Sequence, residues 1–190
     1  MNQCEIWNDF YRKNPRPWRG NNRIPIDGPC NALDIGCGNG KTISTLLDAG
    51  CTVTGIDFSA VAIESCRKNY GGACTLLVSD ATSIPLDDCS FGYITLVHIM
   101  ENLDDEQSKG VAEEVERLLI PGGKAFVRTF SKDDMRSEKK ESGRISYHPR
   151  EPEDICSIFG SLSCEYCRKV EAATRFGQSR SRTEGLFIRR

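Results

Sequence analysis

The chain has 190 residues, of which 38% are hydrophobic and 27% are charged, and its formal net charge is −2. These values are ordinary for a soluble globular protein, and the length suits one domain, residues 1–190, with a core of its own. No apolar run approaches the roughly 20 residues of a membrane span, and residues 1–14 lack the apolar stretch of a secretory signal. We therefore expect a cytoplasmic protein without a membrane partner.

The first 29 residues are aromatic and basic, and their four prolines prevent a long helix. From Cys30 onward, short apolar strands alternate with helices. The predicted strands are residues 30–34, 51–57, 74–78, 93–97 and 124–129, and the predicted helices are residues 41–49, 59–69 and 105–119. Such alternation is typical of a doubly wound α/β fold, in which helices cover both faces of a mostly parallel sheet.

The alternation ends after Thr129, and the rest of the chain is less regular. Residues 131–150 are rich in charge and predict a long loop outside the sheet. A loop of this length in a compact domain is often functional, for example as a lid. Residues 152–159 predict another helix, while residues 164–170 and 183–188 favour strands.

A glycine-rich turn follows the first predicted strand and precedes the first predicted helix. Gly36, Gly38 and Gly40 allow the backbone to approach a ligand closely. The start of the helix offers N–H groups to a polar or anionic part of that ligand. This segment is therefore the candidate ligand site.

Three classes of ligand site use such a turn. A phosphate-binding P-loop fits poorly, because Ile35 stands where its first glycine would be. A dinucleotide site requires a glycine where this chain has Lys41, although Asp57 lies where its ribose-binding acid would fall. Asp34 and Asp80 favour the third class.

Five segments indicate the third class of ligand site: residues 33–40, 55–59, 79–81, 84–92 and 118–123. In order and spacing they resemble the motifs of class I, Rossmann-like, S-adenosylmethionine-dependent methyltransferases of the methyltransferase-domain 11/25 type. The resemblance implies a doubly wound, mostly parallel sheet of seven strands whose last strand, near residues 183–188, is antiparallel. It also divides the chain into a lid or cap segment (1–29), a cofactor-binding core (30–130) and a substrate-side part (131–190).

The resemblance implies that the cofactor is S-adenosyl-L-methionine and the product S-adenosyl-L-homocysteine. Gly36, Cys37, Gly38 and Gly40 would carry the backbone beneath the methionine and ribose parts of the cofactor. Asp34 would help to hold its ammonium group.

The remaining cofactor contacts follow the second, third and fourth motifs. Asp57 would accept hydrogen bonds from both ribose hydroxyls, which suits an ionised carboxylate because it only accepts. Phe58 would pack on the adenine, Asp80 and Ala81 would bind its amino group, and Val97 would line the sulfonium side. The chain departs from many relatives at Gly92, where they have an acid.

Methyl transfer requires alignment and exclusion of water rather than a covalent protein nucleophile. A hydroxyl or amine acceptor must lose a proton, and His98, Glu101 and Tyr11 are the candidate bases; a thiolate or carboxylate acceptor needs none. Tyr11 with Trp18 and Arg19 resembles the Tyr…Pro-Trp pattern of small-molecule methyltransferases, which would fold over the cofactor. Alternatively, these aromatic residues only cover an edge of the sheet.

Charge and cysteine distribution limit the possible partners. Residues 1–23 carry five Lys or Arg against two acids, and residues 164–190 carry seven against three, which allows an anionic partner near the termini. The ten cysteines are dispersed, as expected for small hydrophobic thiols in a reducing cytosol. A lone CxxC at residues 164–167 lacks the second pair of a usual zinc site, so we predict no metal.

The methyl acceptor stays open among several classes. A small-molecule substrate is favoured because no nucleic-acid-binding module can be recognised. An RNA substrate remains an alternative, since the ends are basic and part of the chain resembles methyltransferases acting on the wobble uridine of tRNA. A protein substrate, or a non-catalytic role in binding S-adenosylmethionine, completes the alternatives.

Overall fold

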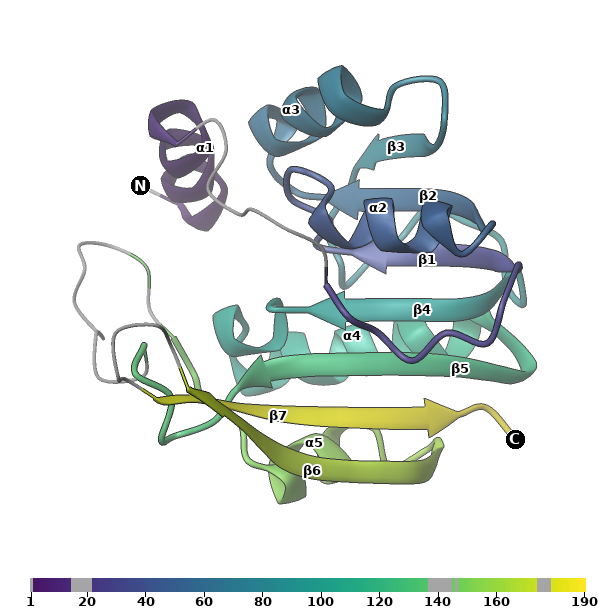
Figure 1. The fold of residues 1–190 in the computed structure, drawn as a ribbon, viewed down its shortest axis with the longest axis vertical. Helices are drawn as coiled ribbons and strands as arrows, with labels where there is room; N and C mark the ends of the chain where they lie inside the picture. Colours follow the sequence, from purple (N-terminus) through teal and green to yellow (C-terminus); the bar gives the residue numbers. More distant parts are fainter. Residues whose placement is uncertain (1, 15–21, 137–144, 146, 174–178) are drawn as a thin grey trace.

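In the part of the chain that the structure describes, a seven-stranded sheet forms the centre and helices cover both faces (Figure 1). The computed structural model describes residues 2–14, 22–136, 145, 147–173 and 179–190. The strands are β1 (Asn31–Ile35), β2 (Thr52–Asp57), β3 (Thr75–Val78), β4 (Phe91–Val97), β5 (Leu119–Phe130), β6 (Ser163–Ala173) and β7 (Ser179–Ile188). The helices are α1 (Gln3–Lys13), α2 (Lys41–Asp48), α3 (Ala60–Tyr70), the short 3-10 helix η1 (Met100–Asn102), α4 (Asp105–Leu118) and α5 (Pro152–Ile158). None of these helices is long and apolar enough to cross a bilayer.

The strand order is β3-β2-β1-β4-β5-β7-β6. β1 pairs in parallel with β2 and β4, β2 with β3, and β4 with β5, whereas β7 lies antiparallel between β5 and β6. The predicted fold, a doubly wound and mostly parallel sheet with an antiparallel last strand, is therefore confirmed.

Alternate residues of the central strands face two different cores. Leu33 and Ile94 belong to the core that also contains the apolar residues of α4 and α5. Ala32 and Tyr93, their neighbours in sequence, belong to the core shared with α2 and α3. Burial on both faces explains why the strands read as continuous apolar runs in the sequence.

Side-chain caps set the starts of two helices. Ser59 Oγ accepts a hydrogen bond from the Ala62 N–H at 3.1 Å and caps α3. Asp104 accepts from the Gln107 N–H at 2.8 Å within a capping box. By contrast, α2 begins directly after Gly40, which has no side chain to cap it. The glycine turn therefore leads into a helix start with no cap of its own.

Helix α1 is a finding that the sequence analysis did not anticipate, because the prolines of that segment follow the helix rather than interrupt it. A capping box between Asn2 and Glu5 starts the helix, and it ends before Pro15. Its Asn8 Oδ1 accepts from Ser59 Oγ at 2.7 Å, and Cys4 Sγ donates to the Phe58 carbonyl at 3.3 Å. These contacts hold α1 against the start of α3 (Figure 1).

The C-terminal strands are longer than predicted. β5 begins at Leu119 rather than at the predicted residue 124, because residues 120–123 are accommodated within the strand by a register shift opposite β4. β7 begins at Ser179, so its first residues lie beside the carboxyl end of β5, where Phe130 pairs with Arg182.

We predict that Ile94→Ala destabilises the protein by about 2–5 kcal/mol, because Ile94 is 0% exposed in β4 and its truncation leaves a cavity. The same substitution at Ile120, which is 40% exposed in β5, is the matched control and should cost less than about 1 kcal/mol. Urea denaturation of both variants measures the difference. Equal losses would contradict the assignment of Ile94 to the core.

Candidate active site

The predicted ligand-binding residues gather at the carboxyl ends of β1, β2 and β4, the edge at which open α/β sheets bind ligands. Two cavities adjoin there, a larger one of about 410 Å³ and a smaller one of about 120 Å³. Both are lined by Trp7, Tyr11, Gly36, His98 and Asn102. Helix α1 thus supplies a wall to both cavities.

The glycine turn presents bare backbone to the larger cavity. Gly36, Gly38 and Gly40 have positive φ angles of 71°, 54° and 90°. At Gly38 a Cβ atom would also lie 2.6 Å from Tyr11 Oη, so the close approach of α1 and the backbone conformation both require glycine.

Asp34 lies at the end of β1 and is only 2% exposed. Thr95 Oγ1 donates to its Oδ1 at 2.7 Å, whereas its Oδ2 has no hydrogen-bond partner among the described residues. Burial raises the pKa of Asp34 to about 7, although the bond from Thr95 opposes the shift. The free oxygen suits a cationic or strongly donating ligand group.

Asp57 ends β2 and is 7% exposed. Its Oδ2 accepts from the Gly38 N–H and its Oδ1 from the Ser59 N–H, both at 2.9 Å. Burial raises the pKa of Asp57 to about 6, and the two backbone bonds oppose that shift. The bonds fix the carboxylate at the wall of the smaller cavity, between the glycine turn and α3.

The smaller cavity brings together the residues expected around an adenine. Phe58, Asp80 and Ala81 line it with Asp57. Asp80 is exposed, and its Oδ1 accepts from the N–H and the hydroxyl of Thr82, both at 2.8 Å. These local bonds hold the carboxylate in place at the edge of the cavity.

His98 lies just beyond β4 and lines both cavities. Its φ of 64° is unusual for a residue other than glycine. Its Nδ1 lies 2.8 Å from Glu101 Oε1, while Glu101 Oε2 accepts from Thr129 Oγ1 at 2.8 Å. Glu101 is 1% exposed, so its fixed carboxylate favours the tautomer with the proton on Nδ1 and leaves Nε2 as an acceptor.

The other predicted site residues fall into two groups. Val97 and Cys37 line the larger cavity. Cys37 is buried, and its hydrogen bond with Cys66, followed by burial, raises the pKa of its thiol, so the thiol remains neutral. Trp18 and Arg19 lie outside the described residues.

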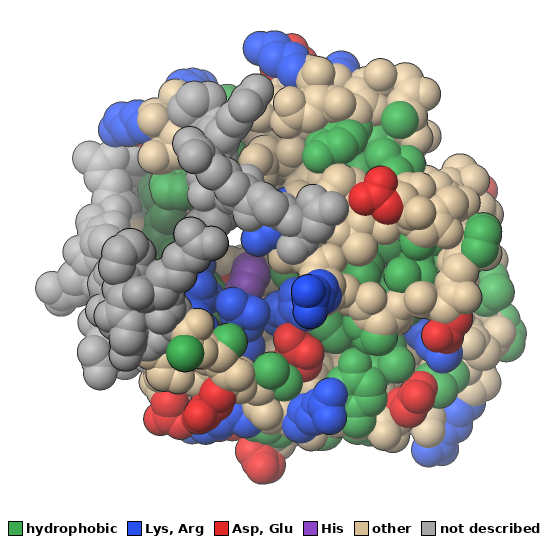
Figure 2. Space-filling view, in the orientation of Figure 1, with side chains coloured by type: hydrophobic (Ala, Val, Ile, Leu, Met, Phe, Trp, Pro, Cys, Tyr) green, Lys and Arg blue, Asp and Glu red, His purple; other side chains and the backbone are tan. Residues whose placement is uncertain are grey.

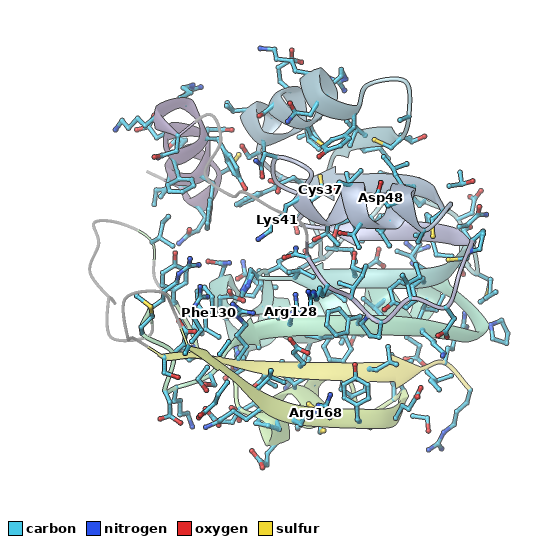
Figure 3. All side chains as sticks on the ribbon, viewed as in Figure 1. Cys37, Lys41, Asp48, Arg128, Phe130 and Arg168 are labelled. Carbon is cyan, nitrogen blue, oxygen red and sulfur yellow. The ribbon has the colours of Figure 1, made fainter. Side chains whose placement is uncertain are left out.

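The sequence analysis missed a group of cationic side chains on the other wall of the larger cavity. They are Arg128 in β5, Arg136 after β5, and Arg180 and Arg182 in β7. Figure 2 shows Lys and Arg side chains gathered around the histidine in the hollow of this face, and Figure 3 places Lys41 across from Arg128 and Phe130. The available signals were the basic C-terminal segment and the two-residue spacing of Arg180 and Arg182.

A family model described as a methyltransferase domain matches residues 33–127. The tRNA N(3)-methylcytidine methyltransferase Mettl2 of Drosophila melanogaster is 30% identical over 127 residues, which are 61% of this chain and 39% of that protein. The demethylmenaquinone methyltransferase of Clavibacter sepedonicus is 34% identical over 109 residues, 56% of this chain and 43% of that protein. The chain thus spans less than half the length of these two curated relatives.

Solved structures share the fold at low identity. The magnesium protoporphyrin IX methyltransferase of Synechocystis, solved with bound S-adenosylhomocysteine, has a TM-score of 0.73 at 16% identity, with 100% of both chains covered. An S-adenosylmethionine-dependent methyltransferase from Methanosarcina mazei has a TM-score of 0.74 at 22% identity, covering 86% of this chain and 94% of the other. At these identities, the likeness concerns the fold.

The buried Asp34 carboxyl generates a prediction about stability. Its pKa is about 7 in the folded chain against an ordinary value of 3.8, so its contribution to the free energy of unfolding is present below pH 4 and is lost as the pH rises to 7. Relative to wild type, Asp34→Asn should therefore gain stability between pH 4 and pH 8, by on the order of 4 kcal/mol. Urea denaturation at pH 4, 6 and 8 measures this difference.

Asp48→Asn, at an exposed position near the end of α2, is the matched control and should follow the wild-type pH dependence. Parallel stability curves for wild type and Asp34→Asn would show that Asp34 does not titrate near neutral pH.

Proposed function

This chain belongs to the methyltransferase-domain family, and from that premise we propose that it is an S-adenosylmethionine-dependent methyltransferase acting on a small-molecule acceptor. The observation that carries the proposal is the pair of buried carboxylates, Asp34 and Asp57, at the carboxyl ends of adjacent strands beside a three-glycine turn. The buried Oδ2 of Asp34 has no hydrogen-bond partner among the described residues.

The residues around the larger cavity, together with Asp34 near the end of β1, which is not itself among the lining residues, fit the methionine end of the cofactor. Asp34 Oδ2 is a buried acceptor without a donor among the described residues, as an ammonium-binding group would be. Lys41, at the first position of α2, lines the same cavity and supplies a cation for the carboxylate. The bare backbone at Gly36 and Gly38 leaves room for the chain between these two ends.

The residues of the smaller cavity fit the adenosine end. Asp57 is held by two backbone N–H groups, which leave further lone pairs of its oxygens for ribose hydroxyls. Phe58 supplies an apolar surface for the base, and Asp80 with Ala81 supplies polar contacts at its edge. The two cavities share His98, and Val97 lines the larger one, which supports a position of the sulfonium side of the cofactor near these residues.

S-adenosylmethionine, when bound, would supply an electrophilic methyl carbon: an acceptor bonds to that carbon while the carbon–sulfur bond breaks and its electron pair stays on the sulfur of S-adenosylhomocysteine. The chain itself aligns the reactants, excludes water and accepts the proton that a hydroxyl or amine acceptor loses. His98 Nε2 is available as an acceptor for the proton of a hydroxyl or amine, and Glu101 orients the imidazole from behind. Tyr11 is a second candidate base. Tyr11 and Trp7 both line the larger cavity, and Tyr11 Oη lies close to Gly38 of the glycine turn.

A tRNA acceptor is the second candidate, and the similarity to tRNA methyltransferases favours it. The basic ends of the chain are consistent with it. Binding of tRNA that weakens steeply with added salt would support this candidate, whereas methylation of filtered small metabolites supports the first. A protein that binds the cofactor without turnover of any acceptor would be a binding module.

Calorimetric titration tests the cofactor assignment. S-adenosylhomocysteine should bind wild type, and Asp57→Asn should bind it at least about tenfold more weakly, because a charge-assisted hydrogen bond to a hydroxyl is lost. S-adenosylmethionine should behave in the same way. Asp48→Asn, which leaves the cavities unchanged, should keep the wild-type affinity.

NADH and ATP are the competing ligands in this titration. Preference for either, or failure of both sulfur nucleotides to bind, would reopen the dinucleotide or phosphate interpretation of the glycine turn and reject the proposal.

We also predict that His98→Ala lowers kcat by about 10²- to 10⁴-fold, the usual contribution of a general base. Transfer of a labelled methyl group from S-adenosylmethionine to a filtered pool of small metabolites measures the rate. S-adenosylhomocysteine affinity should stay unchanged, since His98 is proposed to act on the acceptor.

Glu101→Gln separates positioning from proton transfer. It removes the charge behind the imidazole, so it should lower kcat less than His98→Ala and change the pH profile of kcat. Wild-type turnover in His98→Ala would show that the acceptor loses no proton to this residue.

A further inference from the structure

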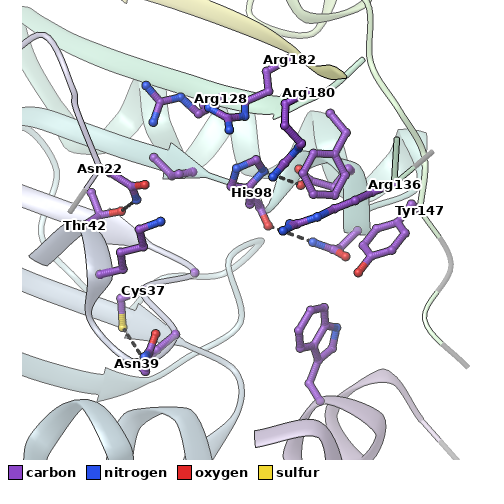
Figure 4. Close-up of a pocket in the computed structure, with 18 of the residues that line it drawn as sticks. Asn22, Cys37, Asn39, Thr42, His98, Arg128, Arg136, Tyr147, Arg180 and Arg182 are labelled. Carbon is purple, nitrogen blue, oxygen red and sulfur yellow. Dashed lines mark hydrogen bonds and ion pairs between the residues drawn. The ribbon is translucent and has the colours of Figure 1, made fainter. Parts of the chain in front are cut away.

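Four guanidinium groups form one wall of the larger cavity, and we call Arg128, Arg136, Arg180 and Arg182 the arginine wall. Figure 4 shows three of them beside one another above His98 and the fourth, Arg136, at the side near Tyr147. Cys37, Asn39 and Thr42 of the glycine turn and α2 lie away from them in the same view. The wall is therefore distinct from the residues proposed to hold the cofactor.

Strand geometry explains why these side chains converge. Arg180 and Arg182 are two residues apart in β7 and so point to the same face of the sheet. In the antiparallel pairing, Arg182 lies opposite Phe130, and Arg128 lies opposite Glu184. Because side chains two residues apart on a strand lie on the same face, Arg128, Phe130, Arg180 and Arg182 all lie on one face of the sheet.

The positive charge of the wall is only partly paired. Arg128 Nε lies 2.7 Å from Glu184 Oε1, and Arg180 Nε lies 3.0 Å from the buried Asp134 Oδ2. Arg182 Nε is buried without a hydrogen-bond partner among the described residues. The only acid that lines the cavity within the described ranges is Glu101, which is already engaged by His98 and Thr129.

The neighbouring cations repel one another, which disfavours their protonated forms. Burial and, after it, the charges of Arg180 and Arg128 lower the pKa of Arg182, and burial followed by Arg180 lowers the pKa of Arg136. Lys41 across the cavity has a lowered pKa for the same two reasons. An anion placed among these groups would relieve both the repulsion and the incomplete solvation.

We infer that the arginine wall is a subsite for an oxyanion group of the methyl acceptor, a phosphate or a carboxylate carrying more than one charge. This inference rests on the proposed function, because the acceptor must share the larger cavity with the cofactor. Guanidinium forks match the geometry of phosphate and carboxylate oxygens. Within the wall, the Nε of Arg182 has no hydrogen-bond partner among the described residues, so this guanidinium keeps donor capacity for an anion.

Phe130 fixes the distance from this subsite to the proposed base. Arg136 Cζ and Arg180 Cζ lie 5.2 Å and 5.5 Å from its ring centroid, and the His98 ring lies 4.6 Å from the same centroid. The two guanidinium groups and the His98 imidazole therefore all pack around one aromatic ring, so an anion held by the wall lies close to the proposed base. An anchor at that distance orients a small molecule for in-line attack.

The position of the wall favours a small molecule over RNA. The four guanidiniums line a cavity of about 410 Å³, and Arg128 is only 7% exposed. A surface that follows a nucleic-acid backbone instead presents cations in an exposed row or groove.

Calorimetric titration of inorganic phosphate, pyrophosphate and citrate into the full chain saturated with S-adenosylhomocysteine tests the inference. We expect at least one probe to bind wild type and to bind Arg182→Gln at least tenfold more weakly. Arg182→Lys, which keeps the charge but not the fork, should fall between them. The affinity of S-adenosylhomocysteine should change less than twofold in each variant.

Arg168→Gln is the matched control, because Arg168 is exposed on β6 of the same sheet and does not line the cavity (Figure 3). Equal weakening in Arg168→Gln and Arg182→Gln would reduce the effect to general surface charge and overturn the inference. Absence of binding of all three probes to wild type would also overturn it. Preference for phosphate probes over citrate identifies a phosphate-bearing acceptor, and the reverse identifies a polycarboxylate.

Two further arms separate this inference from its premise. Asp57→Asn should lose S-adenosylhomocysteine affinity and still bind the anionic probe, so failure of the cofactor titration alone rejects the proposed function and leaves the subsite measurable. Total tRNA that binds through Arg182 and is not displaced by any probe would replace the small molecule by RNA and reject the inference.

Discussion

Asp34 is buried near the end of β1, and its Oδ2 has no hydrogen-bond partner in the part of the chain that the structure describes. The arrangement of the site depends on how that strand is placed. β1 pairs with both β2 and β4, so their carboxyl ends bring Asp34, Asp57 and His98 to one edge. A carboxylate at such a position is poorly solvated, which raises its pKa and also strengthens its interaction with a donor that replaces water. The same desolvation that costs stability in the ligand-free chain therefore provides binding energy.

On the opposite wall of the cavity the poorly solvated groups are cations, so this wall favours an anionic ligand group for the same reason. Arg128, Arg136, Arg180 and Arg182 are brought together by the antiparallel entry of β7 beside β5. Acidic partners lie behind two of the four guanidiniums and leave the cavity side cationic. The cleft is thus divided into an acidic side proposed for the cofactor and a basic side proposed for the acceptor, with His98 between them.

Helix α1 completes the enclosure, although it contributes no strand-end residue. A hydrogen bond between Asn8 and Ser59 attaches it to the start of α3, and this attachment places Trp7 and Tyr11 over both cavities. The contact of Tyr11 with Gly38 makes the glycine turn and the cover one unit. Exclusion of water, which direct methyl displacement requires, is consequently a property of docking between elements rather than of any one motif.

The sequence by itself determined the order of strands and helices from Cys30 to Thr129, because buried parallel strands leave continuous apolar runs and glycine turns leave a local pattern. It also indicated the family, and with it the residues proposed around the cofactor, since Asp34 and Asp57 end predicted strands and Asp80 lies just beyond one. It did not reveal α1, whose capping box at Asn2 and Glu5 is a weak signal beside the four prolines that follow. Only the tertiary structure decided the long antiparallel β6–β7 pair and the arginine wall. Those side chains come from segments about 50 residues apart in the chain, and their convergence depends on strand register and side-chain direction, which local sequence patterns do not encode.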